Sequence, residues 1–291
     1  MGKYNRLLVG LDGSETSFHA LQESFKLSTN WVTVVTVAPS YEGDLRIMGV
    51  SGVREKLREP CDTALARAQE LADAAGAVVR PICAVGLPHE GIVREAEAGN
   101  RDLIILGAKG QSFIERTLMG NITRRVIGFS TKDVLVIPLD ATVGWDRILL
   151  ATDCSSGSRP AINRALELAR AYGGELVVLS VMDLPLKTQE AMGITAEILR
   201  RCQDHVAEVQ RQGEARDLRV KGVVRKGQAY QVIADLAREE HVNLIVMGSH
   251  GHTGLTRLLM GGVTERVIGH APCPVLVVKG DYGQVPDIPL K

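Results

Sequence analysis

An internal repeat constrains the fold of this chain more than any other feature. Four landmarks recur 141 residues apart: Asp12 and Asp153, Gly86 and Gly227, Gly107 and Gly248, and the VLV segments at 134–136 and 275–277. Between segments 107–128 and 248–269, 11 of the 22 positions are identical, which is far more than unrelated segments share. The 291-residue chain is therefore a duplication, and we expect its two halves to share one fold.

Each half alternates short apolar runs with segments of helical spacing. The apolar runs are rich in β-branched residues and continuous more than alternating, which is typical of parallel strands covered on both faces. The alternation predicts an α/β class of two tandem doubly wound domains, 1–141 and 142–291, each a five-stranded parallel sheet with helices on both faces. Strands are expected at 7–11, 32–37, 78–85, 103–106, 134–137, 148–151, 176–181, 220–224, 244–247 and 275–278, with helices in the first half at 14–27, 53–75, 90–98 and 121–129.

Two stretches fit this pattern less well. Segments 39–60 and 183–193 follow the second strand of each half, carry Gly, Pro and mixed charges, and differ in length and content. They are expected to be surface insertions, either flaps over a neighbouring site or loops without a role.

A glycine-rich loop with the spacing G-x2-G-x9-G follows the fourth strand of each half, at 107–120 and 248–261. Glycine reaches positive φ and lets a ligand approach the backbone N–H groups, and the next helix points its positive end at the same place. The alternative is a tight connector, but recurrence of the spacing in both halves favours phosphate binding. Asn121 and Gly262 are the expected N-caps of these helices, and Arg116 and Arg257 are either phosphate contacts or solvated side chains.

Asp12 and Asp153 stand at the ends of the first strands, in GLDGS and ATDCS. In open α/β sheets, ligands bind beyond the carboxyl ends of the strands. Each aspartate is therefore either the residue that starts the next helix, where Ser14 and Ser155 are equally able to cap, or an acceptor for a ligand base or ribose. The two roles are compatible.

Composition excludes several classes of function. Formal net charge is zero, which argues against nucleic acid as a partner. The N-terminal stretch turns polar after one short apolar run and no run reaches roughly 20 apolar residues, so we expect a cytoplasmic protein without a signal peptide or membrane contact. The five cysteines show no CxxC pair and are expected to be free thiols.

Catalytic and metal-binding machinery is not evident in the sequence. Neither half carries the P-loop pattern, a GxGxxG after the first strand, or a GxSxG elbow. His250 and His252 lack a visible third ligand, and Lys109 and Gln111 stand at the equivalent positions, so a metal site is disfavoured. Enzymatic activity stays open and is expected to be at most weak ATP hydrolysis.

Three features together resemble the universal stress protein family: a first strand ending in Asp, the G-x2-G-x9-G loop, and a last strand of the type APCPVLVVKG. The resemblance covers nearly the whole chain as a tandem of two domains. It implies a fold of the adenine nucleotide alpha hydrolase-like type and, for the branch with this loop, ATP or another adenine nucleotide as ligand, with Mg²⁺ as a candidate companion ion.

The resemblance also implies the binding residues. The aspartates would approach the adenine, the valines at the ends of the second strands would contact the base, the early loop glycines would face ribose and phosphates, and the last glycine with its successor would hold the terminal phosphates. The candidate set is Asp12, Val37, Gly107, Gly110, Gly120, Asn121, Asp153, Val181, Gly248, Gly251, Gly261 and Gly262.

One departure from the family pattern bears on affinity. The family has Ser or Thr after the last glycine, where this chain has Asn121 and Gly262. Loss of one hydroxyl contact costs on the order of 1 kcal/mol, so we expect weaker binding or a preference for ADP or AMP.

The last strands of family members pair at the sheet edge. The resemblance implies that 134–137 and 275–278 pair within one chain, giving an intramolecular pseudo-dimer and leaving a homodimer as a further option. The expected function is a nucleotide-binding regulator of the stress response that acts on an unknown protein partner. The alternatives are a slow ATPase or phosphoryl transferase, and a nucleotide-independent interaction module.

Overall fold

The computed structural model describes residues 4–27, 30–40, 52–109, 119–183, 192–249 and 260–280. The first half contains β1 (Leu7–Gly10), α1 (Glu15–Phe25), β2 (Val32–Ala38), α2 (Val53–Ala75), β3 (Val79–Val85), α3 (Pro88–Ala98), β4 (Leu103–Gly107), α4 (Asn121–Phe129) and β5 (Asp133–Ile137). The second half contains β6 (Arg147–Thr152), η2 (Ser156–Ser158), α5 (Arg159–Tyr172), β7 (Glu175–Met182), α7 (Met192–Glu214), β8 (Val220–Lys226), α8 (Ala229–Glu239), β9 (Leu244–Gly248), α9 (Gly262–His270) and β10 (Val275–Val278). The predicted class and element order are thus confirmed.

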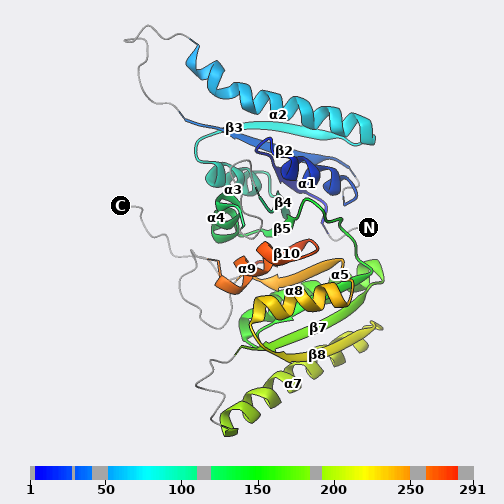
Figure 1. The fold of residues 1–291 in the computed structure, drawn as a ribbon. Helices are drawn as coiled ribbons and strands as arrows, with labels where there is room; N and C mark the ends of the chain where they lie inside the picture. Colours follow the sequence, from blue (N-terminus) through cyan, green and yellow to red (C-terminus); the bar gives the residue numbers. More distant parts are fainter. Residues whose placement is uncertain are drawn as a thin grey trace.

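All described strands join one sheet in the order β3-β2-β1-β4-β5-β10-β9-β6-β7-β8. Within each half every pairing is parallel, as the continuous apolar runs predict. Strand order reverses between β1 and β4 and between β6 and β9, and a ligand crevice is expected at such points. Figure 1 shows the long helices α2 and α7 at the two far ends of this sheet.

The two halves meet through their last strands. β5 and β10 pair antiparallel, with Leu135 opposite Leu276 and Val134 opposite Val277, and they lie side by side at the centre of Figure 1. The resemblance implied this intramolecular pairing, which is observed. Because each strand covers the edge of the other, neither half leaves its last strand unpaired.

Helices cover both faces of the sheet and form two apolar cores. One core packs α1, α2, α5 and α7 on one face, with Leu21, Ala68, Leu166 and Val209 among its fully or nearly fully buried side chains. The other packs α3, α4, α8 and α9 on the opposite face, with Ile92, Ile127, Ile233 and Val267 buried. Central strands such as β4 are buried along their whole length, which explains their unbroken apolar sequence.

Element boundaries differ from the predicted ones by one or two residues at most sites. Helix α2 matches its predicted bounds, so the first presumed insertion, 39–60, was drawn too long: residues from Val53 onward, Pro60 included, are helical. Residues 41–51 and 184–191 of the two presumed insertions lie outside the described residues. No helix in the described part of the chain combines the length and apolar character needed to cross a membrane.

Candidate functional site

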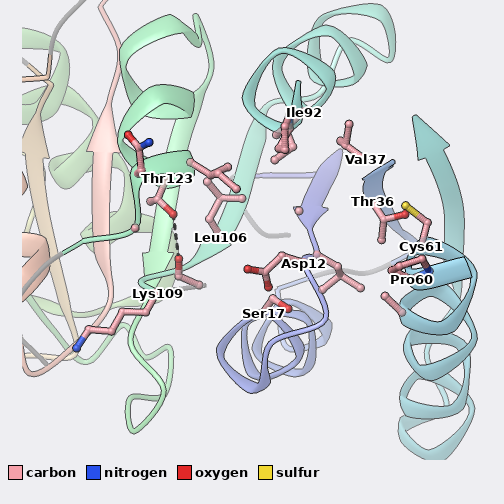
Figure 2. A pocket seen from close by; sticks show the side chains of 18 residues that line it. Asp12, Ser17, Thr36, Val37, Pro60, Cys61, Ile92, Leu106, Lys109 and Thr123 are labelled. Carbon is pink, nitrogen blue, oxygen red and sulfur yellow. Dashed lines mark hydrogen bonds between the residues drawn. The ribbon is translucent and has the colours of Figure 1, made fainter. Parts of the chain in front are cut away.

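A cavity of about 510 Å³ opens at the carboxyl ends of β1, β2 and β4, where the strand order of the first half reverses. We call it the switch-point cavity. Helix α2 contributes Pro60 and Cys61, and the first turns of α3 and α4 complete its wall. In Figure 2, Asp12 lies at the centre, between the α4 side with Thr123 and the α2 side with Cys61. The position is the one that physical rules assign to ligands in open α/β sheets.

Five predicted residues of the first half come together in this cavity. Its lining includes Asp12, Val37, Gly107, Gly120 and Asn121. These residues come from three strand ends and one helix start, so the fold gathers positions that lie up to 109 residues apart in the sequence, since 121 minus 12 is 109. Gly110 and Arg116, together with Gly251, Arg257, His250 and His252 of the second half, lie outside the described residues.

Asp12 organises the turn between β1 and α1. Its Oδ1 accepts hydrogen bonds from the Ser14 amide at 3.0 Å and the Ser14 hydroxyl at 2.6 Å. Ser14, not Asp12, is the N-cap of α1, because its side chain accepts from the Ser17 amide. Asp12 therefore does stabilise the turn, and the hydrogen bonds from Ser14 hold its carboxylate in the wall of the cavity. The second half repeats this turn, with Ser155 donating to Oδ1 of Asp153 at 2.7 Å.

The expectation of positive φ at the loop glycines is wrong wherever the structure describes them. Gly107 and Gly248 are absent from the glycines with positive φ in the described chain, and Gly120 and Gly261 have φ of −60° and −62°. Glycine is required at 107 for another reason. A Cβ there would come within 2.9 Å of the backbone carbonyl carbon and oxygen of Thr16, so β4 and the first turn of α1 approach too closely for a side chain.

The helix predicted at 121–129 is observed as α4, but the N-caps of both helices that follow the loops are one residue earlier than expected. Their N-caps are Gly120 and Gly261, and Asn121 and Gly262 are the first helical residues, so the predicted N-cap positions are wrong by one. Neither N-cap offers a side chain, and no described side chain caps either helix start. The first-turn N–H groups of α4 therefore face the cavity uncapped, with the positive end of the helix dipole behind them. This is the arrangement that binds anions at helix N-termini.

In each half, a threonine of the helix that follows the glycine loop forms a hydrogen bond with the glycine that begins the loop. Thr123 donates from its hydroxyl to the carbonyl of Gly107, and Thr264 donates to that of Gly248, each at 3.2 Å. Sequence reasoning missed these two threonines. They lie 141 residues apart, at equivalent positions of the repeated segment, and the presence of threonine in both halves was the signal that would have found them.

Other cavity residues carried no sequence signal. Thr36, next to the end of β2, is buried, and its Oγ1 has no hydrogen-bond partner among the described residues. Such an orphaned hydroxyl is costly unless a ligand or water satisfies it. Cys61 faces it from α2 (Figure 2), and burial raises the pKa of this thiol, so it stays protonated near neutral pH.

The equivalent strand ends of the second half, which we call the second crevice by analogy with the first half, carry different side chains. At the 141-residue offset, His205 of α7 replaces the small Ala64 that lines the first cavity, and its Nε2 lies 3.0 Å from Oγ1 of Thr152. Cys154 has φ of 62° and places its Sγ 3.1 Å from Oγ of Ser180. Burial lowers the pKa of His205 and raises that of Cys154 to about 12.

Asp153 retains a free acceptor in this second crevice. Its Oδ2 is buried and has no partner among the residues that the structure describes. A buried carboxylate oxygen without a donor is costly, and a ligand N–H or O–H would satisfy it. Val181, Gly248, Gly261 and Gly262 lie at the corresponding strand ends and helix start, as predicted from the sequence.

Metal ligands do not gather in the described part of either half. No group of three His, Cys, Asp or Glu side chains is placed to hold an ion there. The polar groups of the switch-point cavity are the Asp12 carboxylate, the Lys109 ammonium, the Asn121 side-chain amide, hydroxyls and main-chain amides. Together they suit a ligand with an anionic end and a hydrogen-bonding end.

Fold and crevice define a tandem of two doubly wound α/β domains with a ligand crevice at the topological switch point. The chain belongs to the universal stress protein family, whose model matches residues 3–138 and again 144–279. The tandem two-domain arrangement expected from the internal repeat is thereby supported.

The chain is also similar to individual proteins and solved structures. A universal stress protein of Methanocaldococcus jannaschii, MJ0531, is 32% identical over 140 residues, which cover 46% of this chain and 82% of the relative. The crystal structure of a universal stress protein from Archaeoglobus fulgidus matches the fold with a TM-score of 0.71 at 23% identity, covering 96% of this chain and 97% of that one. A universal stress protein crystallised in complex with cAMP is 26% identical and covers 46% of this chain and 96% of its own, with a TM-score of 0.37.

Proposed function

We propose that this protein binds an adenine nucleotide in the switch-point cavity, with the phosphates at the start of α4. The observation that carries the proposal is the uncapped first turn of α4, at Asn121–Thr123, which opens into a cavity of about 510 Å³. Helix N-termini bind phosphate through free N–H groups and the macrodipole. A pocket of this volume is within the range that holds small-molecule ligands.

The opposite end of the cavity suits a nucleoside. Val37 and Ile92 provide apolar surface, as Figure 2 shows, and the orphaned hydroxyl of Thr36 lies beside them. Asp12 lies between this apolar end and the helix start, where its carboxylate accepts a ribose hydroxyl or a base amino group. Apolar walls with a few placed polar groups are the usual composition of such sites.

The second crevice is proposed as a second, differently built adenine-nucleotide site. The buried, unpartnered Oδ2 of Asp153 and the uncapped start of α9 support it. His205 narrows the helix-facing wall where the first half has alanine, and Gly262 offers no side chain where the first half has Asn121. These differences give the two sites different affinities. Mg²⁺ enters the proposal only as a counterion of the bound phosphates.

The proposed physiological role is regulation within the stress response. A nucleotide that binds one conformation more tightly than another shifts the population towards it, and a protein partner then distinguishes the loaded from the empty state. Asp12 is the one carboxylate in the described walls of the cavity, and Ser14 already donates to it. We therefore propose that bound nucleotide stays intact.

The decisive experiment replaces Asn121 by Asp. The two side chains have the same shape, and Asn121 is exposed and accepts a hydrogen bond from Arg124, which Asp also accepts. A carboxylate at a helix start stabilises the helix but repels phosphate. Calorimetry should therefore show ATP affinity falling by tenfold or more, about 1.4 kcal/mol, while adenosine affinity stays unchanged.

The matched control is Gln69→Glu, which adds the same charge to the exposed face of α2. It should leave both affinities as they are. If ATP, ADP and AMP all fail to bind the folded, nucleotide-stripped protein, the proposal is wrong. Turnover of ATP over hours, measured on the same samples by phosphate release, would instead favour the slow hydrolase.

A further inference from the structure

A second large cavity lies at the junction of the two halves, away from every predicted nucleotide-binding residue. Its volume is about 670 Å³, and we call it the junction cavity. Its walls come from the segments before β1, β4 and β5, from the start of α5, and from the end of β10. Neither half could form it alone, because first-half and second-half segments both contribute.

The lining of the junction cavity is strongly cationic in a chain whose net charge is zero. Three acidic residues, Asp102, Asp133 and Glu167, also contribute to the walls. Six cationic side chains also line the cavity, so its walls carry an excess of three positive charges. The cationic side chains are Arg6, Arg101, Lys132, Arg159, Arg164 and Lys279.

Two of the three acids, which the excess of three already takes into account, are held by neighbouring groups. Asp133 is buried and accepts from the Tyr4 hydroxyl at 2.7 Å, from Arg164 at 3.1 Å and from the Lys279 amide at 2.9 Å. Asp102 accepts from the amides of Asn5 and Arg6, each at 3.0 Å. Among the described residues, Arg164 is the one cation of the six with an ion-pair partner.

Arg101 shows the cost of this arrangement most clearly. Its Nε is buried and has no hydrogen-bond partner within the described ranges. Burial lowers its pKa, and the neighbouring guanidinium groups of Arg80 and Arg6 lower it further. Crowded cations with an unsatisfied buried N–H are unfavourable unless an anion compensates them.

The first helices of the two halves, α1 and α5, have different surroundings. On the side of the first half, the connection between the halves packs against α1. His19 Nε2 lies 2.6 Å from the carbonyl of the buried Ala141, and Glu23 accepts from the Val143 amide at 2.8 Å. At the 141-residue offset, Pro160 and Arg164 of α5 replace His19 and Glu23. The junction cavity lies beside this part of α5.

We propose that the junction cavity binds a small polyanion carrying two or more phosphate groups. Guanidinium groups match phosphate oxygens in a bidentate way, and the walls bring three unpaired arginines to one space. The start of the 14-residue helix α5 adds its positive end. Because the ligand would contact both halves, it would link them across the β5–β10 pair.

The test uses inorganic tripolyphosphate as the probe in full-length protein. All samples carry Asn121→Asp and Gly262→Asp, which suppress phosphate binding at α4 and α9 and so isolate the junction cavity. Replacing both Lys132 and Arg159 by Gln should reduce tripolyphosphate affinity by tenfold or more in calorimetry and leave adenosine binding unchanged. Replacing Arg200 and Arg211 by Gln removes the same charge from exposed positions of α7 and should change neither affinity.

A footprint supplies a second readout that does not depend on a variant. Tripolyphosphate should protect Lys132 from a lysine-reactive ester and leave Lys56, exposed on α2, fully reactive. Absence of binding at about 10 mM probe, a concentration at which even weak sites fill, would overturn the proposal. An equal loss of affinity in the α7 control pair would also overturn it, because nonspecific charge would then account for binding.

Discussion

Tyr4 of the first half donates a 2.7 Å hydrogen bond to Oδ2 of Asp133, and the same carboxylate oxygen pairs with Arg164 of the second half at 3.1 Å. The Arg164 guanidinium also lies 5.1 Å above the Tyr4 ring. Asp133 is 5% exposed and its other oxygen accepts from the Lys279 amide at 2.9 Å. One buried carboxylate thus joins the N-terminal segment, α5 and the end of β10.

We expect Asp133→Ala to destabilise the protein by about 2–4 kcal/mol, because its removal leaves the partly buried Arg164, the Tyr4 hydroxyl and the Lys279 amide without their acceptor. Tyr4→Phe removes one hydrogen bond and should cost about 1 kcal/mol. Urea unfolding followed by circular dichroism measures both. Equal effects of the two substitutions would contradict the central role of the carboxylate.

Lys279 should make stability depend on pH. Burial lowers its pKa to about 8, against 10.5 in an unfolded chain, although Asp133 opposes the shift. Between these values the unfolded chain binds more protons than the folded one, so the contribution of Lys279 to the free energy of unfolding rises with pH across that window. The charged form is the one that burial penalises, and this penalty is fully present below pH 8.

The measurement compares wild type with Lys279→Met from pH 7 to 9.5. Any advantage of the variant should shrink as pH rises, because the wild-type lysine loses its proton in the folded state. The comparison cancels Tyr4, Cys154 and Cys273, whose pKa values burial raises in both proteins. A difference that stays constant over the whole range would show that Lys279 titrates normally.

Gly107→Ala should destabilise the first half by about 1–3 kcal/mol, the cost of forcing an overpacked contact. The added Cβ would come within 2.9 Å of the Thr16 carbonyl oxygen, which cannot move without shifting α1. Gly262→Ala is the matched control, because its Cβ would meet nothing within 4 Å and it stands in the first turn of α9. That control should stabilise by up to about 1 kcal/mol, measured as unfolding midpoints.

Gly262→Ser should strengthen nucleotide binding in the second half. It restores the hydroxyl that other members of the family place after the last glycine, next to the uncapped start of α9. One added hydrogen bond to a charged phosphate contributes about 1.5 kcal/mol, roughly a tenfold gain. Calorimetric titration with ATP of this variant and of Gly262→Ala separates the hydroxyl from the loss of glycine, and equal affinities would refute a phosphate contact there.

The fold was readable from sequence because its determinants are local or repeated. Continuous apolar runs such as 103–106 predicted parallel strands that are covered by helices on both faces. Because the repeat has an offset of 141 residues, each strand assignment in one half was supported by its equivalent in the other. The rule that ligands bind at strand ends placed Asp12 at the cavity, the helix start after the glycine loop placed Asn121 there, and the family resemblance supplied Val37.

Three features were beyond the reach of the sequence for physical reasons. Glycine is required at 107 because the backbone there lies against Thr16, which is distant in sequence. An argument from local φ therefore gave the wrong reason for this glycine. The N-cap of α4 was assigned to Asn121 although it is Gly120, one residue earlier, because both residues are acceptable at an N-cap. The junction cavity gathers residues from Arg6 to Lys279, and its existence depends on packing between halves that no local pattern encodes.

The antiparallel β5–β10 contact has an evolutionary consequence. A dimer of two identical chains must carry every substitution at both of its symmetry-related sites at once. Here the same architecture is encoded by one polypeptide, so Asn121 and Gly262, or Ala64 and His205, diverge independently while the shared seam of the sheet keeps both halves in place. One half can therefore acquire a different binding site while the other half keeps its own.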